Sequence, residues 1–403
     1  IDWQDLLFRG AVMNSHDLAI RGATPQTKYS FSGSYVNQDG VVINSGYKRT
    51  QARVSIDQNV TSKLKANLNV NYSVDRNYGS VASLRQSSAN SFASFLMYRT
   101  LGYRPVSNEA DIVNDLFDTE DAVALALMNP LITTQNEIRQ QTKNSLLVNA
   151  GLVYSISNNL TLNIRGGLNS LGTKDEAFYN SKTYKGLASS VNVNGVNGAY
   201  GNSDLKSWVS ENTLTYKKNF RKSSLDVVGG LTFQQIEVET YGYESTNIPN
   251  EELKLRALQL GTPTGIISLA SRNALASAMA RANYRINSKY LFTASMRMDG
   301  SSKFAQENRW GFFPSGAFAW QMGSEDFIKR SDIISDAKLR ISYGLSGNNR
   351  IGDYARYQNV VLSTFFSFNN QKPEYIAMVN NMGNQDLKWE KTAQLDIGYD
   401  LSL

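Results

Sequence analysis

The feature that most constrains this chain is a strict alternation of apolar and polar residues that persists over long segments. It is clearest between residues 63 and 75. The apolar positions there are Leu64, Ala66, Leu68, Val70, Tyr72 and Val74, and the polar positions between them are Lys65, Asn67, Asn69, Asn71 and Ser73. A helix repeats about every 3.6 residues, whereas successive residues of a strand point to opposite faces. The alternation therefore predicts a β-strand with one apolar and one polar face.

The same period of two returns along the whole chain. Clear stripes cover 29–35, 146–156, 160–168, 290–298, 339–345 and 395–403, and weaker candidates lie near 15–22, 48–58, 205–217, 222–237, 274–286 and 310–321. We count about thirteen strands, many of about ten residues or more, against roughly 5–6 residues for a strand in a soluble sheet. A tilted strand needs roughly 9–11 residues to cross a bilayer. The strand lengths favour an all-β fold, an antiparallel transmembrane β-barrel.

Short and long connections alternate between these strands. Short turns are predicted at Val60–Ser62, Ser157–Asn159, Lys218–Arg221 and Asn287–Ser288, and long inserts at 76–141, 170–204, 238–273 and 347–386. In an up-and-down sheet this order puts the tight turns on one rim and the long loops on the other, as in outer-membrane barrels. A soluble sandwich gives no reason for such an order.

Three segments of the long inserts have the composition of short helices, namely Asn90–Thr100, Ala122–Met128 and Asn250–Leu258. Helices in extracellular loops pack over the barrel mouth or hold a partner protein, and surface decoration is the alternative.

Four tyrosines, Tyr154, Tyr216, Tyr284 and Tyr290, lie on apolar stripes close to short turns. Amphipathic rings are enriched at both membrane interfaces, so we expect these four to form part of a periplasmic aromatic girdle. Ordinary strand tyrosines are the alternative interpretation.

Composition and motifs exclude several classes of function. The chain has no cysteine, which removes disulfides, thiolate metal sites and a Cys nucleophile. Its one histidine, His16, has no nucleophile motif around it. Neither H-E-x-x-H, G-x-x-x-x-G-K-[ST] nor an EF-hand spacing occurs. We therefore predict that the protein is not an enzyme, with no catalytic, cofactor-binding or metal-binding residues and no cofactor.

Charge and hydropathy agree with a barrel. The net charge is +6 and the pI is near 9.1, but Lys and Arg are scattered singly, so we expect a partly basic lumen and no nucleic-acid partner. The mean hydropathy of −0.36 is compatible with a membrane protein because a barrel strand is apolar on one face only. No apolar run reaches the roughly 18 residues of a transmembrane helix.

Four stretches carry a resemblance to one family. Residues 295–321 read SMRMDGSSKFAQENRWGFFPSGAFAWQ and resemble the R-x-D-G-S-S-x-F…R-W-G-x-F-P-S…A-W segment of SusC/RagA-like TonB-dependent receptors. The matching residues are Arg297, Asp299, Gly300, Ser301, Ser302, Phe304, Arg309, Trp310, Gly311, Phe313, Pro314, Ser315 and Trp320. The next stretch is similar to the family's L-K-L-R-x-S-Y-G-x-x-G-N run, through Leu339, Arg340, Ser342, Tyr343, Gly344, Gly347 and Asn348.

The other two stretches lie near the two ends. Residues 384–394 resemble the family's N-P-D-L-K-W-E-x-T-x-Q, with Gln385 where Pro is usual. Residues 2–49 look like its opening D-W-Q-D-x-x-F-R segment and the hairpin that follows. Together the four matches span most of the chain.

The motif residues have structural interpretations. Gly300–Ser302 have the composition of a turn. Arg297, Asp299 and Arg340 alternate with apolar residues, so we expect them to face the lumen and to pair with each other or with a plug rather than bind substrate. Trp389 is expected to be a membrane-interface anchor. We nominate none of these as a binding site.

The resemblance implies a TonB-energised importer in the outer membrane of a Gram-negative bacterium. In this family a barrel of about 22 strands surrounds an N-terminal plug. A SusD-like lipoprotein covers the mouth, and TonB drives release from the periplasmic side. Lipid bilayer and lipopolysaccharide surround the wall. The cargo is usually an oligosaccharide and sometimes a peptide, and the long loops 76–141, 170–204 and 238–273 are expected to touch it.

Residues 1–403 are then expected to be part of the β-barrel domain, a partial arc of the wall. The signal peptide, the plug, the TonB box and the final strands would be absent from it, so the TonB complex would act through segments missing here. Two alternatives remain open. One is a siderophore or cobalamin receptor of the same architecture, which lacks a partner lipoprotein. The other is a non-transport, β-rich surface adhesion module.

Overall fold

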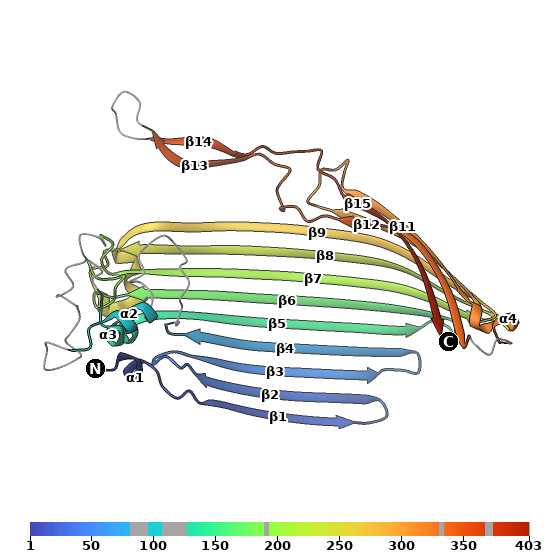
Figure 1. Ribbon diagram of the computed structural model, residues 1–403, viewed down its shortest axis with the longest axis horizontal. Coiled ribbons are helices and arrows are strands. Elements are labelled where there is room, and N and C mark those ends of the chain that lie inside the picture. Colours follow the sequence, from blue (N-terminus) through green and yellow to red (C-terminus); the bar gives the residue numbers. More distant parts are fainter. Residues whose placement is uncertain (81–95, 107–126, 189–192, 330–333, 367–373, 403) are drawn as a thin grey trace.

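A computed structural model describes residues 1–80, 96–106, 127–188, 193–329, 334–366 and 374–402 (Figure 1). Thirteen strands form one antiparallel sheet in the order β1 to β12 followed by β15, and each strand pairs with the strands before and after it in this order. A separate hairpin of β13 (Asn359–Phe366) and β14 (Glu374–Asn381) lies in the connection between β12 and β15.

The strands of the main sheet are β1 (Met13–Ala23), β2 (Thr27–Asp39), β3 (Gly46–Asn59), β4 (Leu64–Tyr78), β5 (Glu137–Ser155), β6 (Leu160–Tyr179), β7 (Asn197–Asn219), β8 (Ser223–Thr246), β9 (Thr262–Ile286), β10 (Tyr290–Ser301), β11 (Trp310–Gln321), β12 (Asp336–Asn348) and β15 (Glu390–Ser402). Every clear stripe and every weaker candidate of the sequence corresponds to one of them, to within one residue at either end; residue 403 of the last stripe lies outside the described residues. The predicted strand pattern is confirmed, and the lengths run from 11 residues in β1 to 25 in β9.

The register puts the apolar stripes of neighbouring strands on one face. Leu68 lies opposite Ile56 and Ala150, and Phe292 lies opposite Tyr284 and Phe318. We call this the outer face and the opposite, polar one the inner face. A slip of one residue would move a whole stripe to the other face, so the alternation specifies the register.

Strand residues extend into all four predicted inserts, and two of the inserts are shorter than the sequence indicated by many residues. Residues 170–179 continue β6, and residues 197–204 already belong to β7. Likewise 238–246 and 262–273 are strand rather than loop. Beyond residue 168 the outer positions of β6 include Lys174 and Glu176, so the apolar alternation ends although the backbone ladder continues. The hairpin β13–β14 within 347–386 was also not predicted.

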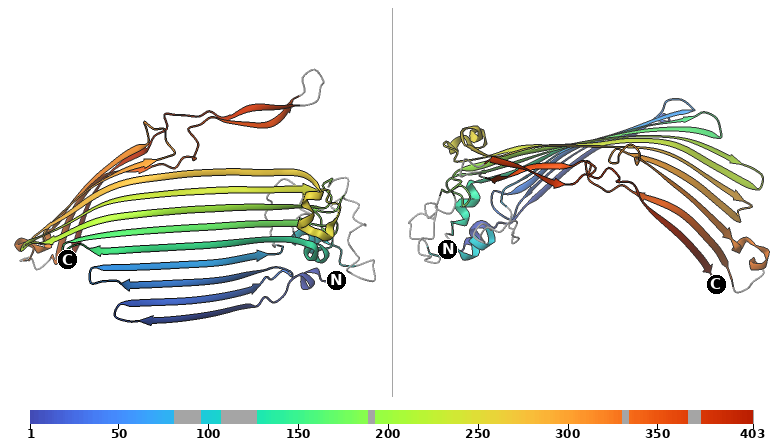
Figure 2. Two further views of the ribbon diagram at one scale, coloured as in Figure 1. Left: turned by 180° about the vertical axis from the view of Figure 1, so that it is seen from behind. Right: turned by 90° about the horizontal axis from the view of Figure 1, so that it is seen from above.

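The two rims of the sheet differ as predicted. Short turns at 24–26, 60–63, 156–159, 220–222 and 287–289 lie at one end, which we call the turn rim (Figures 1 and 2). The longer connections lie at the other end, the loop rim, together with α1 (Trp3–Leu7), α2 (Leu96–Gly102) and α3 (Pro130–Asn136). One connection departs from the pattern. Residues 322–335, with η4 (Met322–Ser324) and α4 (Asp326–Lys329), make a longer link at the turn rim.

The predicted helices are confirmed in part. The described end of the first prediction is helical in α2, and the third corresponds to the 3₁₀ helix η3 (Glu251–Leu260). Of the second, residues 122–126 lie outside the described residues, and Leu127 and Met128 are not helical. None of the helices in the described ranges is long and apolar enough to cross a membrane.

The described sheet is one layer, curved along its strand order (Figure 2). Its outer apolar side chains are uncovered, with Leu18 71% and Ile397 68% exposed. The buried apolar clusters gather instead at the loop rim, for example Trp3 with Tyr103 and Leu127. A water-soluble sandwich would bury these stripes against a second sheet, so this arrangement is that of a membrane-spanning wall.

Candidate functional site

The inner face carries many polar side chains. Polar side chains of adjacent strands bond to one another across it, as in the pairs Gln51–Asn71 at 2.6 Å and Ser55–Asn69 at 2.7 Å. Ser295 and Ser315 form a similar pair at 2.6 Å. Because these groups satisfy each other and leave further valences for water, the inner face suits an aqueous lumen.

A trough of about 980 Å³ lies on this face near the loop rim. Two neighbouring cross-strand rows form it. The first row is Tyr47, Asn77, Gln141, Asp175, Gly201, Gly242 and Ile267, and each residue lies directly opposite the next. The second is Arg139, Ala177, Ala199 and Glu244. The sequence did not predict this trough. Its first row is aligned by the register of seven paired strands, which no single segment of the sequence reveals.

Small residues hollow the middle of the trough. Gly201 and Gly242 lie opposite each other, beside Ala177 and Ala199. A Cβ atom on Gly242 would come within 2.8 Å of the Tyr200 carbonyl oxygen, so a side chain there would force the strands apart. The backbone is therefore accessible at the floor of the trough, and polar and aromatic side chains flank it.

The side chains of the trough wall are held by hydrogen bonds. The Tyr47 hydroxyl donates to Asp75 at 2.5 Å, and Arg49 lies 3.4 Å from the same carboxylate. Gln141 Nε2 donates to Asp175 at 2.8 Å. The volume lies near the upper end of the range of about 300–1,000 Å³ for ligand sites, and the lining combines tyrosine rings with fixed polar groups.

The motif residues of β10 form an internal ion pair. Arg297 Nε lies 2.8 Å from both oxygens of Asp299, and its Nη2 donates to Ser277 at 3.1 Å. Asp299 is only 6% exposed. Arg340 pairs with Asp400 on the neighbouring strand at 2.8 Å. The predicted pairing is confirmed for Arg297 with Asp299, whereas the partner of Arg340, Asp400, had not been predicted.

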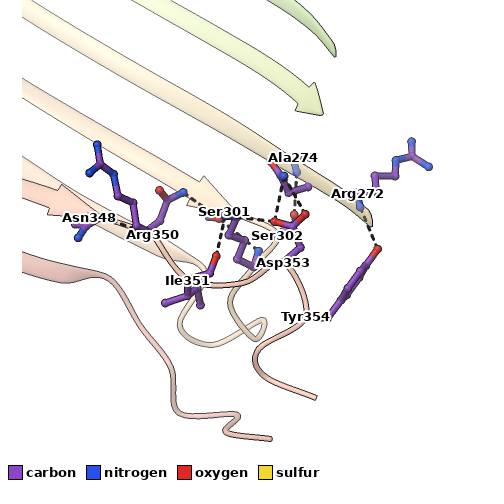
Figure 3. Close-up of polar contacts among 12 residues, drawn as sticks. Arg272, Ala274, Ser301, Ser302, Asn348, Arg350, Ile351, Asp353 and Tyr354 are labelled. Carbon is purple, nitrogen blue, oxygen red and sulfur yellow. Dashed lines mark hydrogen bonds and ion pairs between the residues drawn. The ribbon is translucent and has the colours of Figure 1, made fainter. Parts of the chain in front are cut away.

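The remaining motif residues fasten the connection after β12 onto β9 and β10 (Figure 3). Ser302 Oγ accepts from the Ala274 backbone N–H at 2.8 Å, and the Tyr354 hydroxyl accepts from the Arg272 backbone N–H at 3.1 Å. Lys303 Nζ donates to the Ile351 carbonyl at 2.9 Å. These contacts hold the connection after β12 at the loop-rim ends of β9 and β10, and they do not converge on an open site.

Asp353 is the charged centre of this attachment. Asn273 Nδ2 donates to it at 3.1 and 3.2 Å, and Lys303 Nζ lies 3.3 Å away. Partial burial acts to raise the pKa of Asp353, but the hydrogen bonds from Asn273 and Lys303 outweigh it and hold that pKa below its usual value. The carboxylate is therefore ionised at neutral pH and holds the loop electrostatically.

Trp389 belongs to the same attachment, so its prediction as a membrane-interface anchor is wrong. Its ring packs against Phe304 and Phe313 with centroid distances of 5.5 and 5.4 Å, and its Nε1 donates to the Arg309 carbonyl at 2.8 Å. It is 8% exposed. The error arose because residues 80 positions apart meet here, which local sequence does not reveal.

The predicted girdle tyrosines lie on the outer face at the turn rim, where Tyr290 stacks on Trp320 at 6.2 Å. Glu325 accepts hydrogen bonds there from Lys289 Nζ at 2.6 Å and from the hydroxyl of Tyr290 at 2.9 Å. It also accepts from Trp320 Nε1 at 3.2 Å. The hydrogen bond from Lys289, with those from Tyr290 and Trp320, lowers the pKa of Glu325. One carboxylate thus ties the β9–β10 turn to the β11–β12 connection.

The single histidine and the possible metal ligands were located in the described part of the chain. His16 lies on β1 opposite Tyr35. The described ranges contain no group of three or more His, Cys, Asp or Glu side chains that could hold a metal ion.

Comparisons with known proteins show which family this chain resembles. A family model described as TonB dependent receptor-like, beta-barrel matches residues 92–403. TonB-dependent receptor P3 of Formosa agariphila is 30% identical over 410 residues, which cover 100% of this chain and 39% of that protein. TonB-dependent receptor SusC of Bacteroides thetaiotaomicron is 27% identical over 419 residues, which cover 99% of this chain and 40% of the relative.

Solved structures show the same fold. The structure of the RagAB peptide transporter superposes with a TM-score of 0.75 at 22% identity and covers 99% of this chain and 43% of the compared one. The RagAB peptide importer in its open-open state gives a TM-score of 0.76 at 21% identity. The present chain spans about two fifths of the length of these relatives.

Proposed function

This chain belongs to the family of TonB-dependent receptor-like β-barrels, in the SusC/RagA group of bacterial outer-membrane receptors, and from that membership we propose that it forms part of the wall of an active nutrient importer. The observation that carries the proposal is the single sheet with an apolar outer face, a polar inner face and a large trough near the loop rim. A wall of this kind separates lipid from an aqueous path.

The length of the central strands supports a cargo site outside the bilayer. Strands β5 to β9 have 19 to 25 residues, about twice the roughly 9–11 that cross a bilayer. Their ends at the loop rim therefore project beyond the membrane. The trough rows, at residues 175–177, 199–201 and 242–244, lie in this projecting part.

We infer that the cargo is a large nutrient, an oligosaccharide in the first place and a peptide in the second. Tyrosine rings with neighbouring amides and carboxylates offer stacking surfaces and hydrogen bonds, which sugars and peptides both use. A SusD-like lipoprotein over the loop rim and the TonB complex on the periplasmic side are the proposed partners. Plug and TonB contact would come from parts of a longer receptor outside residues 1–403.

Uptake by cells that carry or lack the gene tests this proposal. Labelled oligosaccharide and peptide mixtures are offered to both strains, and the medium is analysed by mass spectrometry for the species that only the complemented strain depletes. Depletion should stop when the proton gradient that energises TonB is collapsed. Equal depletion by both strains of every species in the mixtures would contradict import.

The adhesion alternative is separated by extraction. A barrel wall needs detergent for release from membranes and shows a heat-modifiable band on a gel, whereas a surface adhesin of soluble sheets is released without detergent. A siderophore receptor would instead deplete iron chelates and would not need a co-expressed SusD-like lipoprotein.

A further inference from the structure

Strand β9 has a free edge beyond the end of β10. The ladder between the two strands stops at the pair Ser301–Leu275, whereas β9 continues back to Thr262 and stays paired with β8 on its other side. β9 therefore runs past β10 toward the loop rim (Figure 1). Among the described residues, no group bonds to the backbone of residues 265–271 on the side that β10 leaves open.

Two contacts cap this edge where it begins. The backbone N–H of Ala274 donates to Ser302 Oγ at 2.8 Å, and that of Arg272 donates to the Tyr354 hydroxyl at 3.1 Å (Figure 3). Alternate residues of a strand direct their N–H and C=O groups to the same side. Three residues farther along therefore direct theirs to the free edge, namely Ile266, Ser268 and Ala270.

The free edge lies outside the hydrocarbon part of the bilayer. On the outer face, charged residues replace the apolar stripe at this depth, where Glu237 lies opposite Arg272. Glu239 follows two residues later and lies opposite Ala270. An open edge is not tolerated in hydrocarbon, where its N–H and C=O groups find no partner. In the projecting part of the wall these groups are hydrated and can exchange water for another backbone.

The edge lacks the usual protection against strand addition. Residues 264–271 contain no charged residue and no proline. Ile266 is 80% exposed, Leu269 68% and Ile267 49%. Proteins block exposed edges with charges, proline or a covering segment, and a long uncharged apolar edge is a template for another strand.

We propose that this edge of β9 binds an extended segment of a peptide cargo, which adds to the sheet as a further strand. The inference rests on the proposed import function and selects the peptide from the two proposed cargo classes. Gly265, Ile266 and Ile267 also line the trough, so the edge and the trough adjoin. A cargo held in the trough is therefore within reach of the edge.

The chemistry of the edge selects the peptide. Its N–H and C=O groups recur every second residue, about 6.6–6.8 Å apart, and an extended peptide repeats at the same interval. An oligosaccharide carries hydroxyl groups on each ring but no such alternating N–H and C=O groups. Ile267 on the inner face and Ile266 on the outer face offer apolar contacts to alternate side chains of the added strand.

Peptides that the full-length receptor retains from a casein digest are the probes. They are identified by mass spectrometry, synthesised, and titrated by calorimetry into the native receptor in detergent. Each is also made in two forms, N-methylated at alternate residues in one phase or in the other. Strand addition uses the amides of one phase only, so we expect one form to bind at least about tenfold more weakly than the other.

A proline at the edge tests the position of the site. Ser268→Pro removes an edge N–H but leaves the β8 ladder intact, because the N–H of Ser268 points away from β8. The peptide should bind this variant at least about tenfold more weakly than the native receptor, a change of about 1.4 kcal/mol. Ser268→Ala keeps the N–H and should recover most of the loss. If Ser268→Pro fails to fold, the two N-methylated forms on the native receptor decide.

Three results overturn the edge site. They are the retention of no peptide, equal binding of the two N-methylated forms, and equal affinity in Ser268→Pro and the native receptor. A fourth concerns β13, whose Leu362 is 64% exposed. A disulfide that forms between Ser268→Cys and Leu362→Cys without peptide would show that β13 occupies the edge instead.

Uptake assays separate this site from the import function. Energised uptake of oligosaccharides by a receptor that retains no peptide overturns the edge site while import stands. Peptide binding with the expected N-methylation pattern, but without energised uptake of any cargo, contradicts import while the edge site stands.

Discussion

The attachment of the β12–β15 connection gives the sharpest quantitative prediction. Trp389 is 8% exposed and fills the space between Phe304 and Phe313, with Leu345 and Ile351 packed around the cluster. Replacing it by alanine removes the largest ring of the cluster and leaves the Arg309 carbonyl without its indole donor. The perturbation should act on residues 349–357, which this cluster holds against the sheet.

Burial of this kind has a known magnitude. Truncation of a buried Trp or Phe to alanine costs about 3–5 kcal/mol. If the attachment opens locally, 3 kcal/mol corresponds to an opening equilibrium about a hundredfold more favourable. Trp389→Phe keeps a ring and loses the hydrogen bond, so its cost should be nearer about 1 kcal/mol.

Hydrogen exchange of the full-length receptor in detergent measures this opening. Amides within 349–357 should exchange about a hundredfold faster in Trp389→Ala, while those of β5 to β8 keep their protection. Trp208→Ala is the control, because Trp208 lies on the outer face of β7 and is 43% exposed. If exchange in 349–357 is the same in the native receptor and in Trp389→Ala, the cluster does not hold this connection and the reasoning fails.

Three further predictions concern the turn rim, the trough and the outer face. The lowered pKa of Glu325 means that its contribution to stability is present above its ordinary pKa of about 4.3 and lost as the pH falls through the lower folded value. Urea unfolding should therefore show Glu325→Gln less stable than the native receptor at pH 7, with the difference shrinking at acidic pH; a constant difference contradicts this. Gly201→Leu, whose Cβ has only ordinary contacts at 3.9 Å, should fill the trough and reduce cargo uptake at least about tenfold at equal surface expression. Gly166→Leu on the outer face should leave uptake intact, and equal loss in both would refute a role for the trough. For the outer face, Leu214→Arg should make the free energy of folding into lipid vesicles less favourable by about 2–4 kcal/mol, whereas Thr213→Arg on the inner face should change it little. Similar costs for the two variants would show that the two faces were assigned wrongly.

How far the sequence alone predicts this molecule depends on the range of the interaction. A strand with lipid on one side and water on the other must alternate, so Leu64 to Val74 gave both the strand and its orientation. The alternation also predicted that Arg297 and Asp299 share a face, two residues apart. Where lipid no longer acts on the outer face, as at Lys174 and Glu176, the pattern disappears and the predicted strand ended too early.

Contacts between distant segments were beyond sequence reasoning for a different reason. Trp389 meets Arg309 only because β15 returns beside β12, and Trp3 meets Tyr103 only because α2 lies beside α1. Nothing in the composition of KWE or of MYRT signals burial. Arg99 of α2 is 4% exposed, whereas a lone arginine in a sequence is normally predicted to be a solvated charge.

The family motifs and the trough are formed by different parts of the chain. Residues of two family motifs, R-x-D-G-S-S-x-F and D-L-K-W-E, make contacts within the protein. Asp299 and Ser302 form hydrogen bonds, and Phe304 and Trp389 pack together at the loop rim. The two cross-strand rows of the trough come from β3 to β9, which carry none of those motif residues. We therefore expect receptors that share the motifs to share the attachment of the β12–β15 connection, and we expect their cargo preference to depend instead on side chains that line the trough. It follows that exchanging the trough segments 137–188 and 193–286 between two such receptors should transfer cargo preference, whereas exchanging 295–321 should not.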